Sequence, residues 1–356
     1  FLSTEENKRA SFLDRSRIQR LDSCSWVSLI FVFLVSTRTR PQSFTEMDFI
    51  FFLIIFGIFF NFGNFQRQKI PDFDINDEEI RQLVRRLRSE DINKAKPSQI
   101  RLDYQGHTNS RDINDAASRP LFASVDSSIF RKPTYEKFLA LTDNYNFEVG
   151  KIEKSDNKER QEIISFIDAI FETGPWKILI NFLVQKRHPF VKDIRTFKLW
   201  IKQLWFEDYS RAKGVADTSG FEHVFIGESK NGQVAGLHNW VRFYTLERNQ
   251  SANFDYKGFI IKRFNTFAMV RYTWSGIVKR TGGFFIGTSP EFDMAIYTMC
   301  FLSRRGFKTC DFDLDGCPFS ITSYDMNQFN KVFIGTIYPS AGPMTDQCRN
   351  AHRTHG

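Results

Sequence analysis

Several common signatures are missing from this sequence. It contains no C-x-x-C pair and no H-E-x-x-H motif, so the usual zinc-ligand patterns are excluded. Its longest apolar run, residues 49–60, is shorter than the roughly 20 residues that span a membrane as a helix. No internal repeat is present. Histidine is scarce, with six among 356 residues, so any catalytic imidazole comes from a small set.

The overall composition indicates a folded, basic protein. Hydrophobic residues make up 42% of the chain, which is enough for a sizeable core and disfavours disorder. The formal net charge of +8 suits a polyanionic partner. Charge alone does not discriminate between RNA, DNA, heparin and an anionic membrane surface.

The first methionine, Met47, directly precedes the apolar run at residues 49–60. The length of this run is typical of a signal peptide, so we expect a signal peptide over residues 47–66 and a secreted protein. Residues 1–46 are then a non-native or unstructured extension, and residues 67–350 form the folded domain. No basic residue separates Met47 from the run and no A-x-A site follows, so a buried helix or a membrane anchor is the alternative.

The cysteines fit a secreted chain. Four of them follow residue 46, and an even number predicts two disulfide bonds with three alternative pairings. Four buried thiols are the alternative. The sequence Asn249-Gln250-Ser251 is an N-glycosylation acceptor if the chain is secreted. The four cysteines are Cys300, Cys310, Cys317 and Cys348.

Helical patterns dominate up to about residue 210. Asn76 and Glu79 form a capping-box pattern, and apolar residues follow at helical spacing. The arginines on the opposite face are interpreted as a solvated surface, with an RNA-facing patch as the alternative. Further amphipathic stretches cover residues 134–145, 159–171 and 194–206.

From about Phe221 the pattern changes to aromatic and β-branched runs separated by glycine, which predicts strands of a mainly antiparallel sheet. A helical pattern at residues 291–302 interrupts them. The sequence therefore predicts an α+β fold, with a helical N-terminal lobe followed by a C-terminal sheet lobe carrying the catalytic cleft. The predicted strands are VFIGES, QVAGLHNWVRFY, YKGFIIKRF, FAMVRYTW, FFIGTS, FSITSY and KVFIGTIY.

A hairpin turn is predicted at Asn231-Gly232, because a type I′ turn favours these residues. The turn pairs Lys230 with Gln233, and continuing that register places His238 opposite Phe225. His223 then shares a face with His238, at a backbone separation of roughly 7–8 Å. A phosphodiester fits between two such imidazoles, unless a bulge at one of the nearby glycines breaks the register.

Two imidazoles beside a phosphate suit RNA cleavage by the 2′-hydroxyl of the substrate. One removes the 2′ proton while the other protonates the leaving 5′ oxygen. Lys279 is a natural cation for the charge that develops on the phosphoryl oxygens. DNA has no 2′-hydroxyl and could not react in this way. The alternatives are a chance pairing of histidines and a zinc site of His223, Glu228 and His238.

Several longer segments resemble the EndoU family of poly(U)-specific endoribonucleases, which is distantly related to the coronavirus uridylate-specific endoribonuclease. The resemblance covers about residues 73–340, and its motif set is highly specific. The segments are PLFASVDSSIFRKPTYEKFLALTDNY, LWFEDYSR, FEHVFIGE, GLHNWVRFY, YKG, W-S-G-I-V-K, FFIGTSPEFDMAIYTMCF and GTIYP.

The resemblance implies cleavage beside uridines, 2′,3′-cyclic phosphate and 5′-hydroxyl ends, and activation by Mn²⁺ or Ca²⁺. It places the family's catalytic triad on His223, His238 and Lys279. It also assigns substrate-binding positions to two acidic residues beside the first histidine and to a tyrosine near the sugar and base. Loop solvation of the acids and core packing of the tyrosine are the alternatives. These three residues are Glu222, Glu228 and Tyr338.

One motif departs from the family. Members commonly have K-P-V-G-S where this chain has K-R-T-G-G, so Gly283 replaces the serine that faces uracil. Thr281 is the nearest hydroxyl, and it is therefore a further candidate for substrate binding. Uridine preference depends on these positions more than cleavage does.

The metal ligands are not located by the sequence. Asp311 and the alternating aspartates after it imitate the opening of an EF-hand loop, yet Thr322 stands where a bidentate Glu is required. A tight turn between Cys310 and Cys317 is the preferred interpretation. Taken together, we expect a secreted, monomeric, single-strand-specific endoribonuclease without stable membrane insertion. The alternative is a catalytically silent RNA-binding or extracellular interaction module on the same fold.

Overall fold

The computed structural model describes residues 68–212 and 214–353. The expected extension at residues 1–46 and the signal peptide at residues 47–66 lie outside the described residues and stay predictions. Among the residues that are described, no helix is both long enough and apolar enough to cross a bilayer.

The N-terminal half is helical, as predicted, and its first helix begins at the expected cap. The side chain of Asn76 accepts a hydrogen bond from the backbone of Glu79, and the Glu79 side chain accepts one from the backbone of Asn76. This reciprocal cap satisfies two backbone groups that a helix start leaves open. The apolar face of the helix is buried. The helices are α3 (Asp77–Ser89), α4 (Pro133–Ala140), α5 (Asn157–Phe171), α6 (Gly174–Gln185) and α7 (Ile194–Phe206).

One helix is shorter than predicted, and another was not predicted. The stretch at residues 134–145 forms a shorter helix, because α4 ends at Ala140. Helix α6 was not predicted. Its sequence is apolar around most of its circumference and buries residues such as Trp176 and Leu183, so it lacks the amphipathic stripe that reveals a surface helix.

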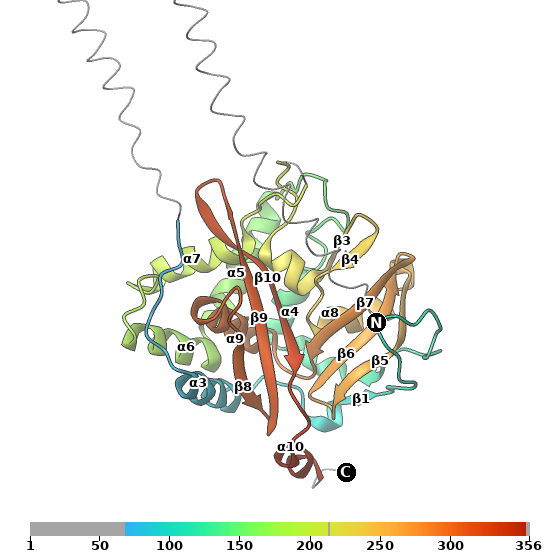
Figure 1. Ribbon diagram of the computed structural model, residues 1–356. Coiled ribbons are helices and arrows are strands. Elements are labelled where there is room, and N and C mark those ends of the chain that lie inside the picture. Colours follow the sequence, from blue (N-terminus) through green and yellow to red (C-terminus); the bar gives the residue numbers. More distant parts are fainter. Residues whose placement is uncertain (1–67, 213, 354–356) are drawn as a thin grey trace, which may run out of the picture. The chain divides into compact units, whose positions relative to one another are not determined.

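The C-terminal half contains two three-stranded antiparallel sheets with strand orders β5-β6-β7 and β10-β9-β8. Strands β7 and β10 contact each other, so the two sheets meet along these strands (Figure 1). The predicted mixture of N-terminal helices and C-terminal antiparallel strands is confirmed. The strands are β5 (Phe254–Arg263), β6 (Phe267–Trp274), β7 (Ile277–Phe285), β8 (Cys310–Leu314), β9 (Cys317–Gln328) and β10 (Lys331–Ala341).

The remaining elements connect or cover these sheets. Helix α9 (Pro290–Ser303) confirms the predicted helix at residues 291–302, and nearly all of it is buried. Two short hairpins, β1 (Ile100–Leu102) with β2 (Phe122–Val125) and β3 (Glu228–Lys230) with β4 (Gln233–Ala235), lie outside the larger sheets. The other helices are α8 (Trp240–Arg248) and α10 (Asp346–Ala351).

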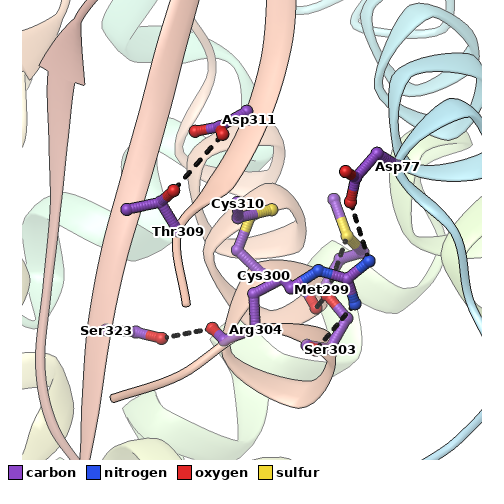
Figure 2. The surroundings of a disulfide bond; sticks show 9 residues. All are labelled: Asp77, Met299, Cys300, Ser303, Arg304, Thr309, Cys310, Asp311 and Ser323. Atoms are coloured by element: carbon purple, nitrogen blue, oxygen red, sulfur yellow. Dashed lines mark hydrogen bonds and ion pairs between the residues drawn. A yellow bond between two sulfur atoms is a disulfide. The ribbon is translucent and has the colours of Figure 1, made fainter. Parts of the chain in front are cut away.

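Both predicted disulfides are present, as Cys300–Cys310 and Cys317–Cys348. The first joins α9 to the start of β8. Figure 2 shows that Arg304 beside it reaches Asp77 at the start of α3, at 2.9 Å. The bond therefore lies where the N-terminal helix, α9 and the second sheet converge.

The aspartate-rich segment between the disulfides is a tight β-turn, as preferred over a calcium loop. Asp315 and Gly316 occupy the turn with positive φ values of 50° and 85°. The carboxylate of Asp315 pairs with Arg88 of α3 at 2.6 Å. This segment therefore links the sheet to the helical lobe.

The buried imidazole of His188 makes the stability of the fold depend on pH. It lies between Phe73 and Phe190, and burial lowers the pKa of its imidazole to about 4. The unfolded chain therefore binds a proton more readily, and stability is lost as the pH falls from 6.5 towards 4. We expect His188→Gln to reduce the loss of unfolding free energy between pH 7 and pH 4.5 by up to about 3 kcal/mol. Urea titrations of both proteins at the two pH values measure this, and equal losses would contradict it.

Candidate active site

The hairpin predicted at Asn231-Gly232 is present, with Lys230 opposite Gln233 and Glu228 opposite Ala235. Beyond that point the predicted register is wrong. Residues Glu222–Ile226 form a single π-helical turn rather than a strand, and it ends at Gly227 with φ 87°. The end of the second predicted strand, residues 240–244, lies instead in helix α8.

Backbone contacts nevertheless bring the two histidine segments together. The amide of Leu237 donates to the carbonyl of His223 at 3.1 Å, and the amide of His238 donates to that of Val224 at 2.7 Å. Gly236 makes this approach possible. A Cβ atom there would lie 1.6 Å from the His223 carbonyl oxygen, so only glycine fits.

His223 is held at both ring nitrogens. Its Nδ1 lies 2.7 Å from a carboxylate oxygen of Glu228, and its Nε2 lies 2.9 Å from the hydroxyl of Thr336 on β10. Burial lowers the pKa of His223 to about 4, and the nearby Arg211 acts in the same direction. A neutral imidazole therefore donates from Nδ1 to the Glu228 carboxylate and accepts the Thr336 hydroxyl at Nε2.

Glu228 is buried, and protein groups occupy both of its carboxylate oxygens. One contacts His223 and lies 3.2 Å from Arg211, while the other accepts the hydroxyl of Thr218 at 2.6 Å. Burial alone would raise the pKa of Glu228, but the hydrogen bond from His223 and the charge of Arg211 hold it below its ordinary value. Glu228 is therefore ionised and positions His223.

His238 is anchored by the main chain. Its Nδ1 donates to the carbonyl oxygen of Gly283 on β7 at 2.9 Å, which leaves Nε2 as the basic nitrogen. Among the described residues, no protein group forms a hydrogen bond to that Nε2. Burial lowers the pKa of His238 well below its usual value, and the charge of Lys279 lowers it further.

Lys279 lies on β7, where it is paired with Tyr272 of β6. Burial lowers the pKa of its ammonium group to about 8, while Glu228 partly opposes this shift. The ammonium group therefore carries a charge at neutral pH. Because this charge lowers the pKa of both His223 and His238, the structure brings together all three predicted triad residues.

Glu222 differs from its neighbour Glu228. Its side chain is fully buried, and neither carboxylate oxygen has a hydrogen-bond partner among the described residues. Burial raises its pKa well above the ordinary value, and the charge of Glu228 acts in the same direction. Glu222 therefore faces the protein interior.

The candidates for base binding lie in different surroundings. Tyr338 on β10 is half-buried, and its ring centre is 5.9 Å from that of His238. Thr281 on β7 is exposed, whereas Gly283 is buried. Of these positions, Tyr338 is the one packed directly against a triad residue.

Gly283 offers no room for the serine that is common in the family. A Cβ atom there would lie 2.9 Å from the carbonyl oxygen of Pro339 and 3.1 Å from the ring of Phe267. We expect Gly283→Ser to lower the unfolding free energy by about 1–3 kcal/mol, because a packed site must expand. Urea denaturation of the wild-type protein and of the variant measures this. An unchanged transition in Gly283→Ser would contradict the expectation.

Two contributors to the site were missed from the sequence. Arg211 and Thr336 lie in the segments LWFEDYSR and GTIYP, which carried the resemblance, but neither residue type stands out alone. Arg211 forms an ion pair with Glu228 and donates to the hydroxyl of Tyr209 at 2.8 Å. The family motifs were the only signal that pointed to these positions.

The described residues around the two imidazoles form no ligand set for the implied Mn²⁺ or Ca²⁺. Over residues 68–212 and 214–353 there is no group of three or more His, Cys, Asp or Glu side chains that could hold a metal ion. Near the histidines, the oxygens of Glu228 already bind protein groups.

Several known proteins are similar in sequence to this chain. The uridylate-specific endoribonuclease of Bos taurus is 37% identical over 275 residues, which cover 74% of this chain and 65% of the relative. Uridylate-specific endoribonuclease C of Xenopus laevis is 35% identical, with 74% of this chain and 89% of the relative covered. The chain thus spans about two thirds of the length of the bovine relative.

A solved structure shares the fold. It is described as "The structure of XendoU: a splicing independent snoRNA processing endoribonuclease", and it is 33% identical with a TM-score of 0.64. The match covers 76% of this chain and 99% of that chain.

The helical lobe and the paired antiparallel sheets are the fold of this solved endoribonuclease structure. Residues 79–339 match the family model described as "Endoribonuclease XendoU". The chain belongs to this family.

Proposed function

We propose that the protein is an endoribonuclease that cleaves single-stranded RNA beside uridines, leaving 2′,3′-cyclic phosphate and 5′-hydroxyl ends. The observation that carries the proposal is the different anchoring of the two imidazoles. His238 is fixed by a backbone carbonyl, and His223 by a carboxylate. Such a pair can act as base and acid on one phosphodiester. The names of the relatives support RNA as the substrate.

The anchors assign the roles. His238 has no carboxylate partner, and its Nε2 accepts the proton of the substrate 2′-hydroxyl as that oxygen attacks phosphorus. His223 donates a proton from Nε2 to the 5′ oxygen as the P–O5′ bond breaks. The carboxylate of Glu228 stabilises the imidazolium form that His223 needs before donation. Lys279 offsets the negative charge that develops on the phosphoryl oxygens.

Both imidazoles are neutral at pH 7 in the free protein, because their pKa values are lowered. A bound phosphodiester adds negative charge beside them and raises both pKa values, which favours the protonated form of His223. Substrate binding therefore prepares the acid.

The decisive experiment uses an RNA oligonucleotide with one uridine and two matched versions that carry 2′-deoxyuridine or 2′-O-methyluridine at that position. We expect cleavage of the unmodified RNA alone, with a 2′,3′-cyclic phosphate identified by mass spectrometry. Cleavage of the deoxyuridine version would overturn the mechanism. Binding without cleavage of any RNA would favour a catalytically silent RNA-binding module.

Base choice is tested separately. We propose that Tyr338 contacts the sugar and base, because its ring packs beside His238. Oligonucleotides that differ only in the base 5′ to the scissile phosphate measure the preference. Equal rates for all four bases would overturn uridine preference while leaving the cleavage mechanism intact.

We also propose that Mn²⁺ or Ca²⁺ activates the enzyme and that the protein is a secreted monomer. Activation by Mn²⁺ or Ca²⁺ is tested by initial rates after dialysis against a chelator and after addition of each ion. Equal rates with and without the ions would overturn it.

Secretion is supported by the two disulfides, and N-terminal sequencing of protein from culture medium tests it. Size-exclusion chromatography tests the monomer.

A further inference from the structure

The turn between β9 and β10 carries an unusual residue. It consists of Phe329 and Asn330, and both have positive φ values, 52° and 59°. Such a turn favours Asn and Gly, and a bulky aromatic residue in this conformation is strained. The Phe329 side chain is also 62% exposed, so burial in the core does not compensate for the strain.

The conformation of this turn is held by its neighbours. The side chain of Gln328 accepts from the amide of Ser210 at 2.9 Å and donates to its carbonyl at 2.7 Å. Lys331 on the other side pairs with Glu207 at 2.8 Å. Surrounding structure thus fixes the two residues that flank the turn, and backbone strain of this kind concentrates at binding sites.

A cavity of about 190 Å³ lies at the same tip. Its lining combines the aromatic ring with the side-chain amides of the flanking residues. An aromatic face stacks on a flat ring, and the exposed side-chain amide of Asn330 offers a hydrogen-bond donor and an acceptor, which suits an unpaired nucleobase. The lining residues are Asn327, Gln328, Phe329, Asn330 and Lys331.

The tip is continuous with the catalytic site. Strand β10 runs from Lys331 to Thr336, which contacts His223. Seven residues at the rise of an extended strand separate Phe329 from Thr336 by about 20 Å. Figure 1 shows this hairpin extending beyond α7. Tyr324 of β9, opposite Thr336, is also exposed, so aromatic surface continues along the ribbon.

We propose that Phe329 is a stacking platform for an unpaired base of the RNA strand, several nucleotides from the scissile phosphate. This inference rests on the proposed function, because it takes RNA as the substrate. The platform adds affinity for longer RNA and takes no part in bond cleavage. Exposed aromatic residues bind single strands in this way with little sequence preference.

The test compares Phe329→Asn with the wild-type protein. Asparagine tolerates positive φ, so the unfolding midpoint in urea should stay the same or rise. The dissociation constant for a twelve-nucleotide RNA protected by 2′-O-methyluridine should increase about 5- to 100-fold. The kcat/KM for a uridine-containing dinucleotide should not change. Phe329→Trp should restore the affinity for the long RNA.

Phe307 provides the matched control, because it is fully exposed at 105% in another turn. Phe307→Ala should leave both RNA measurements unchanged. Unchanged affinity of Phe329→Asn for the long RNA would overturn the platform, as would an equal loss with both RNAs. If the wild type cleaves no RNA, the proposed function fails, while the dissociation constants of the protected RNA still decide the platform.

Discussion

Replacing His238 with alanine is expected to lower the single-turnover rate of RNA cleavage by about 10²- to 10⁴-fold. The variant loses the basic nitrogen that removes the 2′ proton, while the carboxylate partner of His223 and the charge of Lys279 stay in place. Affinity for an uncleavable RNA should change little, because the phosphate contact from Lys279 is retained. Rapid-quench kinetics with excess protein and a fluorescence binding titration measure the two quantities.

His107→Ala is the matched control for this experiment. His107 is exposed and lies outside the triad, so its removal should leave the cleavage rate unchanged. A His238→Ala variant that folds normally and cleaves RNA at the wild-type rate would remove His238 from the mechanism. A loss confined to RNA affinity would instead assign His238 to binding.

Glu228→Ala should lower the free energy of unfolding strongly. The guanidinium group of Arg211, 3.2 Å from Glu228 and largely buried, would lose its carboxylate partner. Breaking a buried ion pair by removing one member costs about 3–5 kcal/mol. Glu207→Ala is the matched control, because its pair with Lys331 is exposed and contributes about 1 kcal/mol or less. Urea denaturation of both variants measures the difference, and equal losses would contradict the prediction.

Glu228→Gln separates the role in positioning from the role in stability. The amide keeps a similar shape but removes the charge that favours the imidazolium form of His223. The pKa of His223 therefore falls below its value of about 4. The alkaline limb of the kcat/KM profile should therefore move to lower pH. A profile that keeps its shape and only decreases in height would assign Glu228 a purely structural role.

The sequence predicted the larger periodic elements well. The capping box at Asn76, the amphipathic helix α7 and the alternating first half of strand β9 each carry a local pattern that tertiary contacts did not override. Helix α6 had no such pattern, because it is apolar on most sides. Local periodicity therefore marked these three elements and missed α6, whereas the helical pattern at residues 291–302 predicted the buried helix α9.

At the active site, sequence-based prediction was limited by the hairpin register. The turn at Asn231-Gly232 fixed the hairpin register, but this register ends at Gly227 and Gly236. There the chain forms a π-helical turn around His223. The alternation of side chains along a strand cannot predict such a turn. The family motifs, rather than the predicted strand geometry, identified the three triad positions. They did not reveal the roles of Arg211 and Thr336, which depend on contacts over long sequence separations.

The different anchors of the two imidazoles also predict how each tolerates mutation. The orientation of His223 depends on side chains, and substitution of Glu228 or Thr336 removes one of its partners directly. The orientation of His238 depends on the peptide oxygen of Gly283, which every amino acid possesses. Random mutagenesis with selection for inactive protein should therefore recover second-site changes around the acid more often than around the base. The base is protected because its partner belongs to the backbone.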